Sequence, residues 1–236
     1  MIERGAARLW RLRAPLALLA LHAGARAASD AATGPAPRGR VDVSKLPAPG
    51  RYRLARIMRA PDGTVLESDG RAHRLHRLLA GRLTVVSFMY TYCRDPEGCP
   101  KAWAAMEALH AVLLAQPELA AVSQLVSLSF DPSNDTPQQM RHYGGERVAD
   151  ARVRWRFLTT ASVPALLPLL DGFGQDVTVE TDARGRPTRT LNHMLKLFLV
   201  DEALQVREVY SVATLSHEAM VNDLRTLAME RAAARP

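Results

Sequence analysis

The chain has 236 residues, a formal net charge of +7 and only two cysteines. A chain of this length can bury a hydrophobic core without covalent staples, and two cysteines exclude a disulfide-rich scaffold. The arginines are scattered among aspartates and glutamates, and no basic stripe carries interleaved aromatic side chains. We therefore expect no nucleic-acid partner.

Residues 1–27 have the order of segments that is typical of a secretory signal peptide. Four arginines between positions 4 and 13 precede an apolar run at 14–21, and the small residues Ala25 and Ala27 follow. We predict export to the periplasm with cleavage after Ala27; the alternative is an uncleaved segment that anchors the protein to the inner membrane, facing the periplasm. These residues carry five Arg and one Glu, so removing their +4 from +7 leaves the mature chain near +3.

Residues 28–50 are rich in Ala, Pro, Gly and Ser, which predicts a flexible linker before one domain at 51–236. The predicted elements of that domain, in chain order, are a hairpin of strands 52–57 and 65–66, a short helix at 73–79, a strand at 83–90, a helix from 100 to 117, a strand at 125–130, a helix at 138–143, a strand at 154–158, a helix at 162–170, a polar loop at 181–192, strands at 195–200 and 206–210, and a helix at 216–230. This order predicts an α/β fold, a thioredoxin-like three-layer sandwich with a central mixed sheet and an N-terminal hairpin.

The two cysteines, Cys93 and Cys99, follow directly on the apolar strand 83–90. Pro100 suits the first turn of a helix, so we expect the pair at the junction of a buried strand and the next helix. Between the cysteines, Asp95-Pro96-Glu97-Gly98 has the residues of a type I turn, which would fold the chain back and let the two sulfurs approach. Free N–H groups at the helix start favour a thiolate, which serves both as a nucleophile and as a soft metal ligand.

Histidine is the other residue type that could complete a metal site. His193 lies just before an apolar strand and after the polar loop, a position typical of functional residues. His73 and His76 lie among arginines, which disfavours a cation there, and we expect His110, His142 and His217 to be solvated on helices. Met194 is a weak soft ligand in principle, but we expect it to point into the core.

Several motifs occur in an order that resembles the SCO/SenC family, whose members are thioredoxin-like copper proteins that help to assemble the copper centre of cytochrome c oxidase. The motifs are VVSFMYTYC at 85–93, Cys99-Pro100, SLSFDP at 127–132, Asp135-Thr136-Pro137, and His193 followed by FLVD at 198–201. The resemblance spans roughly residues 50 to 230. This chain has five residues between its cysteines where the family usually has three.

The resemblance implies that Cys93, Cys99 and His193 bind copper and that Asp95 takes the place of the acidic residue between the cysteines. Two thiolates and one imidazole suit Cu(I), and copper(II) also ranks high in divalent affinity. The resemblance further implies a metallochaperone rather than an enzyme, with a respiratory oxidase subunit or another copper protein as partner.

Two alternatives remain open. Cys93 and Cys99 could be the catalytic residues of a thiol–disulfide oxidoreductase that acts on cysteines of an exported target. They could instead form one structural disulfide in a non-catalytic thioredoxin-like domain.

Overall fold

The computed structural model describes residues 42, 45–93 and 98–234. These residues all belong to the unit that spans 37–236. The predicted signal peptide at 1–27, most of the predicted linker and Asp95 lie outside the described residues. None of the helices in the described part of the chain is both long and apolar enough to cross a membrane.

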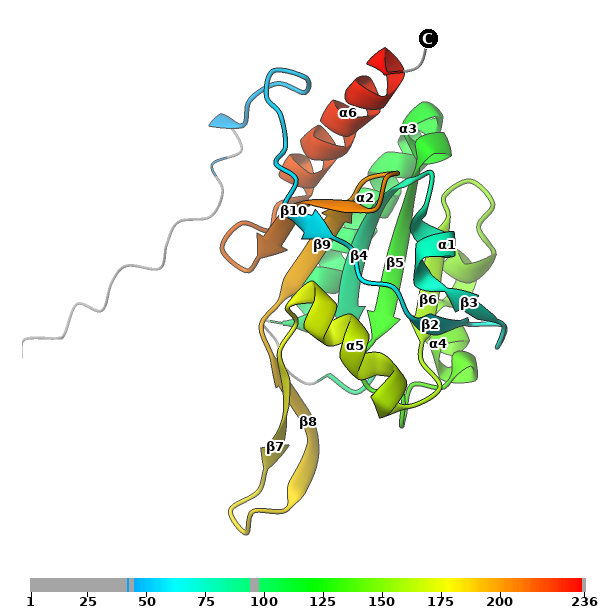
Figure 1. Cartoon of the computed structure of the whole chain (residues 1–236), viewed down its shortest axis with the longest axis vertical. Helices are drawn as coiled ribbons and strands as arrows, with labels where there is room; N and C mark the ends of the chain where they lie inside the picture. Colours follow the sequence, from blue (N-terminus) through cyan, green and yellow to red (C-terminus); the bar gives the residue numbers. More distant parts are fainter. Residues whose placement is uncertain (1–41, 43–44, 94–97, 235–236) are drawn as a thin grey trace, which may run out of the picture. The chain divides into compact units, whose positions relative to one another are not determined.

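A mixed eight-stranded sheet forms the centre of the described unit (Figure 1). In spatial order its strands are β1 (Met58–Arg59), β10 (Gln205–Ser211), β9 (Lys196–Val200), β4 (Leu83–Met89), β5 (Ser123–Ser129), β6 (Trp155–Thr159), β2 (Thr64–Glu67) and β3 (Ala72–Arg74). Strands β4, β5 and β6 are parallel, whereas β9 runs antiparallel to β4. The predicted α/β fold with a central mixed sheet is confirmed.

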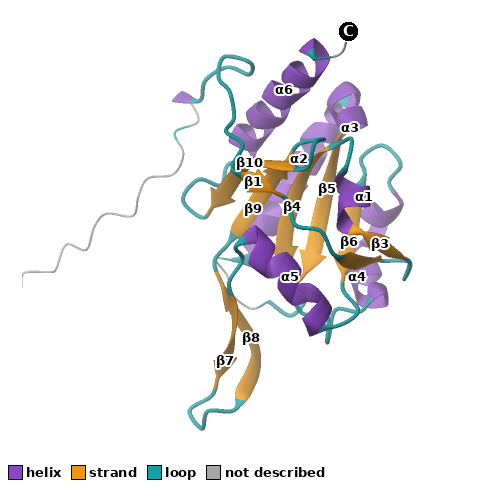
Figure 2. Ribbon diagram, in the orientation of Figure 1, coloured by secondary structure: helices purple, strands orange, loops and turns teal. Residues whose placement is uncertain are grey.

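Helices cover both faces of this sheet and enclose a separate hydrophobic core on each (Figure 2). One core packs beneath α2 (Cys99–Ala115), α3 (Pro117–Val122), α4 (Pro137–Gly144) and α6 (His217–Ala233). The other packs beneath α1 (Leu75–Leu79) and α5 (Val163–Phe173). Every residue of β4 and β5 is buried, as expected for parallel strands covered on both faces.

The structure contains an N-terminal hairpin, but its strands are not the predicted pair 52–57 and 65–66. Strand β2 pairs with β3, while residues 52–57 are not a strand and the two residues of β1 pair with β10. The guanidinium of Arg207 explains why 52–57 needs no partner strand: it donates to the carbonyls of Leu54 and Ala55 at 2.9 and 3.0 Å. The alternation that predicted a strand instead reflects packing of Leu54 against the core.

Residues 50–52 are tied to the C-terminal helix by partly buried hydrogen bonds. The hydroxyls of Tyr52 and Tyr210 both donate to the carboxylate of Asp223 on α6, at 2.6 and 2.7 Å. The amide of Gly50 donates to the hydroxyl of Thr226 at 3.0 Å. Since Asp223 is buried, these two donors satisfy a carboxylate that would otherwise be costly to remove from water.

We predict that Tyr52→Phe lowers the free energy of unfolding by about 1–2 kcal/mol, because one oxygen of a buried carboxylate loses its donor. Burial, followed by the hydrogen bond to Asp223, raises the pKa of Tyr52 to about 12. Between pH 10 and 12 the unfolded chain therefore loses a proton that the folded chain keeps, so stability falls as pH rises through this window. Denaturant unfolding across that range should show a shallower fall for Tyr52→Phe than for the parent, and equal slopes would contradict the assignment.

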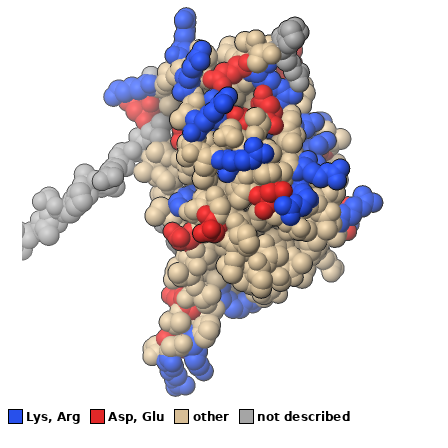
Figure 3. Space-filling view, viewed as in Figure 1, with Lys and Arg blue, Asp and Glu red and all other residues tan. Residues whose placement is uncertain are grey.

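The prediction of a polar loop at 181–192 is wrong. This segment forms most of a second hairpin. Strands β7 (Val177–Thr181) and β8 (Pro187–His193) pair antiparallel as a separate two-stranded sheet that projects from the domain (Figure 1). Gly185 adopts a positive φ of 72° in the turn, a conformation that side chains with a Cβ rarely adopt. Basic side chains gather at the tip, where Arg184 and Arg186 flank this glycine (Figure 3).

Three further departures concern helices. Helix α3 and the short 3-10 helix η2 (Gly145–Ala149) are not predicted from the sequence, because each is too short for a periodic pattern. Helix α5 extends to Phe173 although Pro168 lies inside it. It ends at Gly174, which adopts the left-handed conformation that commonly terminates helices.

Candidate metal centre

The end of β4 leads directly into the segment that carries Cys93. The amide of Phe130 donates to the carbonyl of Met89 at 3.0 Å, and the amide of Cys93 donates to the carbonyl of Tyr90 at 3.3 Å, which turns the chain. Cys93 is partly exposed in this turn. Cys99 begins α2 and is only 7% exposed, with Pro100 as the next residue. The predicted placement of the pair between a buried strand and a helix is confirmed.

A buried carboxylate holds this segment in place. Asp135 is fully buried and accepts hydrogen bonds from the Thr91 amide at 3.1 Å, from the Thr91 hydroxyl, and from the Ser129 hydroxyl at 2.6 Å. Burial raises the pKa of Asp135, and the hydrogen bonds from Ser129 and Thr91 oppose that increase. Thr91 is two residues before Cys93, so Asp135 fixes the path of the chain immediately ahead of the first thiol.

Two tyrosines approach the thiols from the two faces of the sheet. Burial raises the pKa of Tyr90 to about 12; the hydrogen bond from Leu191 opposes this rise, whereas the charge of Cys93 and its hydrogen bond with the Tyr90 hydroxyl add to it. Burial also raises the pKa of Tyr143 on α4, and the charges of Cys99 and Cys93 contribute next. Tyr90 packs in the core under α5, which also includes Cys99 and borders on Cys93, whereas Tyr143 packs against the core under α2.

The sequence indicates Tyr90 only as part of a motif, and it gives no indication of a role for Tyr143. Tyr143 lies near the end of α4, and its ring contacts Trp103 with a centroid distance of 4.8 Å. In the sequence, Tyr143 is one aromatic residue in a short polar helix. That pattern does not indicate which residues its side chain contacts.

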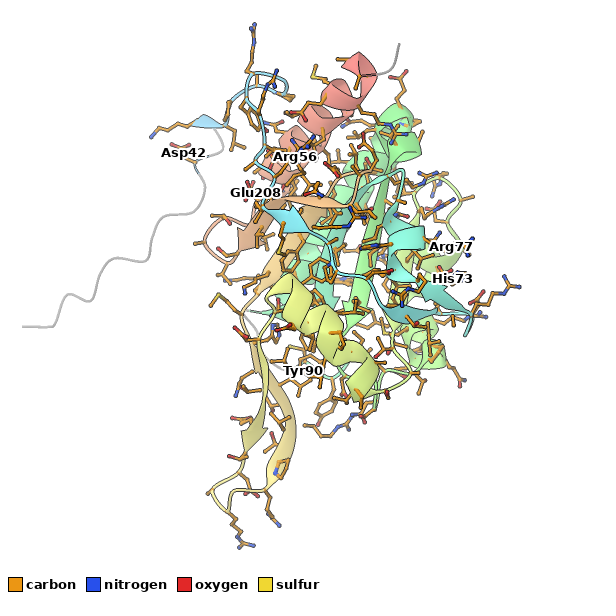
Figure 4. All side chains as sticks on the ribbon, in the orientation of Figure 1. Asp42, Arg56, His73, Arg77, Tyr90 and Glu208 are labelled. Atoms are coloured by element: carbon orange, nitrogen blue, oxygen red, sulfur yellow. The ribbon has the colours of Figure 1, made fainter. Side chains whose placement is uncertain are left out.

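His193 is the last residue of β8, at the base of the projecting hairpin. Its ring packs against Phe130 with a centroid distance of 4.5 Å and against Tyr90 edge-on at 6.4 Å. Tyr90 also accepts a hydrogen bond from the Leu191 amide at 3.4 Å. Tyr90 lies near the end of the sheet from which the hairpin projects (Figure 4). The fold therefore brings His193 into the neighbourhood of the cysteine segment across about a hundred residues of sequence.

The three predicted ligands share this neighbourhood without forming a closed site. Within residues 42, 45–93 and 98–234, no three His, Cys, Asp or Glu side chains are placed so that they could hold a metal ion. Cys93 and Cys99 are not joined by a disulfide. Two thiols and an imidazole nevertheless fit the ligand preference of Cu(I). His193 lies on a hairpin whose strands do not pair with any strand of the main sheet.

The other histidines and Met194 are placed as follows. His73 pairs with Glu67 at 3.1 Å, and the ring of His76 lies 2.7 Å from the Ala60 carbonyl. The expectation that His110 is solvated is wrong: it is 9% exposed and packs against Trp155 with a centroid distance of 5.5 Å. The expectation that Met194 points into the core is also wrong, because it is 64% exposed and lies between β8 and β9, outside either strand.

Together the fold and this arrangement define a class: a thioredoxin-like α/β domain with a cysteine pair at the end of a central strand. Residues 64–229 match the SCO1/SenC family, and the chain belongs to that family. The predicted membership is thus confirmed. A comparison with curated proteins found no match.

Solved structures share the fold at low sequence identity. Arabidopsis thaliana ScoI with copper bound is 16% identical, with a TM-score of 0.59 over 72% of this chain and 98% of that one. A SCO1/SenC family lipoprotein from Bacillus anthracis is 24% identical, with a TM-score of 0.57 over 78% and 99% of the two chains. BsSco is 21% identical, with a TM-score of 0.56 over 75% and 98%; it is described as a member of the Sco family of cytochrome c oxidase assembly proteins with a disulfide switch.

Proposed function

We propose that this protein binds one copper ion through Cys93, Cys99 and His193 and passes it to the copper centre of a respiratory oxidase. The observation that carries the proposal is the meeting of the cysteine segment and the His193 hairpin at one end of the sheet, in a chain of the SCO1/SenC family. Relatives in this family have been solved with copper bound. The protein would act as a metallochaperone rather than as an enzyme.

The chemistry of the donors supports Cu(I) as the cargo. Thiolate is a soft ligand, and Cys99 lies at a helix N-terminus, where negative charge is stabilised. Zinc would accept the same three ligands but normally completes a tetrahedron. Three ligands on two separate segments suit a cargo that must leave, since an incoming thiol of the acceptor could replace them one at a time.

The proposal is tested by titrating the reduced protein with Cu(I) against a chromophoric competitor. We expect one Cu(I) per chain, and His193→Ala should weaken binding at least about 10-fold, because the loss of a group that merely supports a ligand already costs about 10- to 100-fold. His142→Ala is the matched control, because His142 is exposed on α4. Stoichiometry below one, or equal affinity in the two histidine variants, would overturn the three-ligand site.

Thiol–disulfide exchange is the second candidate function, favoured by the unequal exposure of the pair. Cys93 is partly exposed and Cys99 buried, which suits an attacking and a resolving thiol respectively. The reduction potential of the pair separates the candidates. A value below about −300 mV would indicate an inert structural disulfide and would exclude this role.

Export to the periplasm belongs to the same proposal. A periplasmic location, with residues 1–27 as a cleaved signal or an uncleaved inner-membrane anchor, would place the protein beside exported oxidase subunits. N-terminal sequencing of protein from a cell fractionation distinguishes cleavage after Ala27 from an anchor.

A further inference from the structure

The β7–β8 hairpin carries His193 but has few ties to the rest of the domain. It forms a two-stranded sheet of its own, and isolated hairpins of this kind are marginally stable. At its base, the side chains of Gln175 and Lys196 donate to the carbonyls of Met194 and Gly174. What orients its strands toward the cysteine segment is therefore a small set of contacts, made by residues of β8 and by Val177 of β7.

In β8 these contacts come from Arg189, Leu191 and His193. Leu191 and His193 are two residues apart and share a face, whereas Arg189 lies where the register of β8 against β7 shifts. Each of the three meets the cysteine side of the sheet. The guanidinium carbon of Arg189 lies 4.0 Å from the ring centroid of Tyr92. The amide of Leu191 donates to the Tyr90 hydroxyl, and the His193 ring packs on Phe130.

We propose that the Arg189–Tyr92 stack is a latch that docks the hairpin on the cysteine segment and so positions His193 as a ligand; this inference rests on the proposed function. Tyr92 is the residue immediately before Cys93, and Arg189 is four residues before His193 in β8. The stack thus joins the segment of one predicted ligand to the strand of another, in addition to the hydrogen bond from Leu191 to Tyr90. Arg189 is a positioning residue and does not contact the cargo.

The strength of such a stack makes the latch reversible. Arg189 is exposed, and a cation–π contact at an exposed site shifts an equilibrium by about two- to five-fold, which corresponds to about 0.5–1 kcal/mol. A docked hairpin would thus be favoured without being locked. Undocking would withdraw the imidazole from the thiols, which is the change needed when the cargo is handed to an acceptor.

The first test uses the metal-free, reduced protein. The Leu191 amide donates to Tyr90 only while the hairpin is docked, so its hydrogen exchange reports docking directly. Arg189→Ala should speed this exchange about two- to five-fold. Arg184→Ala removes the same charge from the turn of the same hairpin and should leave the rate unchanged. Equal rates in the two variants would overturn the latch.

A double-mutant cycle assigns the effect to the stack itself. Tyr92→Leu should match Arg189→Ala, and Tyr92→Phe should stay close to the parent. The variant that combines Tyr92→Leu with Arg189→Ala should exchange no faster than either single variant. Additive effects would show that Arg189 acts on something other than Tyr92 and would overturn the proposed contact.

The second test measures Cu(I) affinity in the same variants. We expect Arg189→Ala to weaken binding about two- to five-fold relative to Arg184→Ala. Suppose that the parent binds Cu(I) and that Arg189→Ala speeds hydrogen exchange but leaves the Cu(I) affinity at the parent's value. The latch then does not position His193, and the inference fails. If the parent binds no Cu(I), the proposed function fails, whereas the hydrogen-exchange result still decides whether the latch exists.

Discussion

Replacement of either cysteine by serine is expected to lower Cu(I) affinity by at least about 100-fold, the largest functional effect of any substitution in this chain. The estimate follows from metal sites in which the loss of a supporting group alone costs about 10- to 100-fold, so the loss of a thiolate ligand costs more. Serine keeps the size of Cys93 and Cys99 but supplies a hard oxygen donor that Cu(I) disfavours. The measurement is competitive Cu(I) titration of each variant under reducing conditions.

Met194→Leu is the control for these variants. Met194 offers the remaining soft sulfur next to His193, and its side chain is 64% exposed, so it can be exchanged without disturbing a core. We expect its Cu(I) affinity to equal that of the parent. Retention of tight binding by Cys93→Ser, or a loss in Met194→Leu as large as that of a cysteine variant, would contradict the assigned ligand set.

Asp135→Ala is expected to cause the largest loss of stability near the site, about 3 kcal/mol, because three hydrogen bonds lose their acceptor. The amide and hydroxyl of Thr91 and the hydroxyl of Ser129 all donate to this buried carboxylate. For a domain of this size, such a loss lowers the melting temperature by about 6–12 °C. Thermal unfolding by circular dichroism measures the change, and a second effect should follow in weaker Cu(I) binding as the cysteine segment loosens.

Asp135→Asn separates the hydrogen bonds from the charge. An asparagine can place its amide oxygen where Oδ2 of Asp135 accepts from the Thr91 amide and Ser129, and its amide nitrogen can donate to the Thr91 hydroxyl, which accepts as well as donates. We therefore expect Asp135→Asn to retain most of the stability. A loss equal to that of Asp135→Ala would show that the negative charge, rather than the hydrogen-bond geometry, holds the segment.

The strands and helices that the sequence predicts correctly are those with a clear signal in the sequence, such as a long apolar run or a proline at a helix start. Strand β4 is apolar along almost its whole length because both of its faces are covered, and Pro100 marks the start of α2. The same two features locate the cysteine pair at the end of the sheet. The family motifs then connect the pair with His193, a link that periodicity alone could not make.

The errors arise where a side chain replaces a neighbouring strand, or where a strand lacks a buried face. Residues 52–57 alternate like a strand, yet Arg207 takes up the carbonyls of Leu54 and Ala55. Strands β7 and β8 contain no fully buried residue, and β8 is polar along most of its length, so the segment 181–192 resembled a polar loop. The contacts of Tyr143, Arg189 and Asp135 around the cysteines depend on tertiary packing, which no local pattern encodes.

The pairing of β9 with β4 has a consequence for how the domain is made. His193 reaches the cysteine end of the sheet because β9, which begins three residues later, pairs antiparallel with the strand that leads to Cys93. A ribosome releases Cys93 and Cys99 about a hundred residues before the chain segment that completes their surroundings. Long-range pairing of this kind is slow to form, and domains emerge N-terminal end first during synthesis. Each new chain therefore passes through a stage in which both thiols exist before His193 and β9 are in place, open to oxidants and to unintended partners.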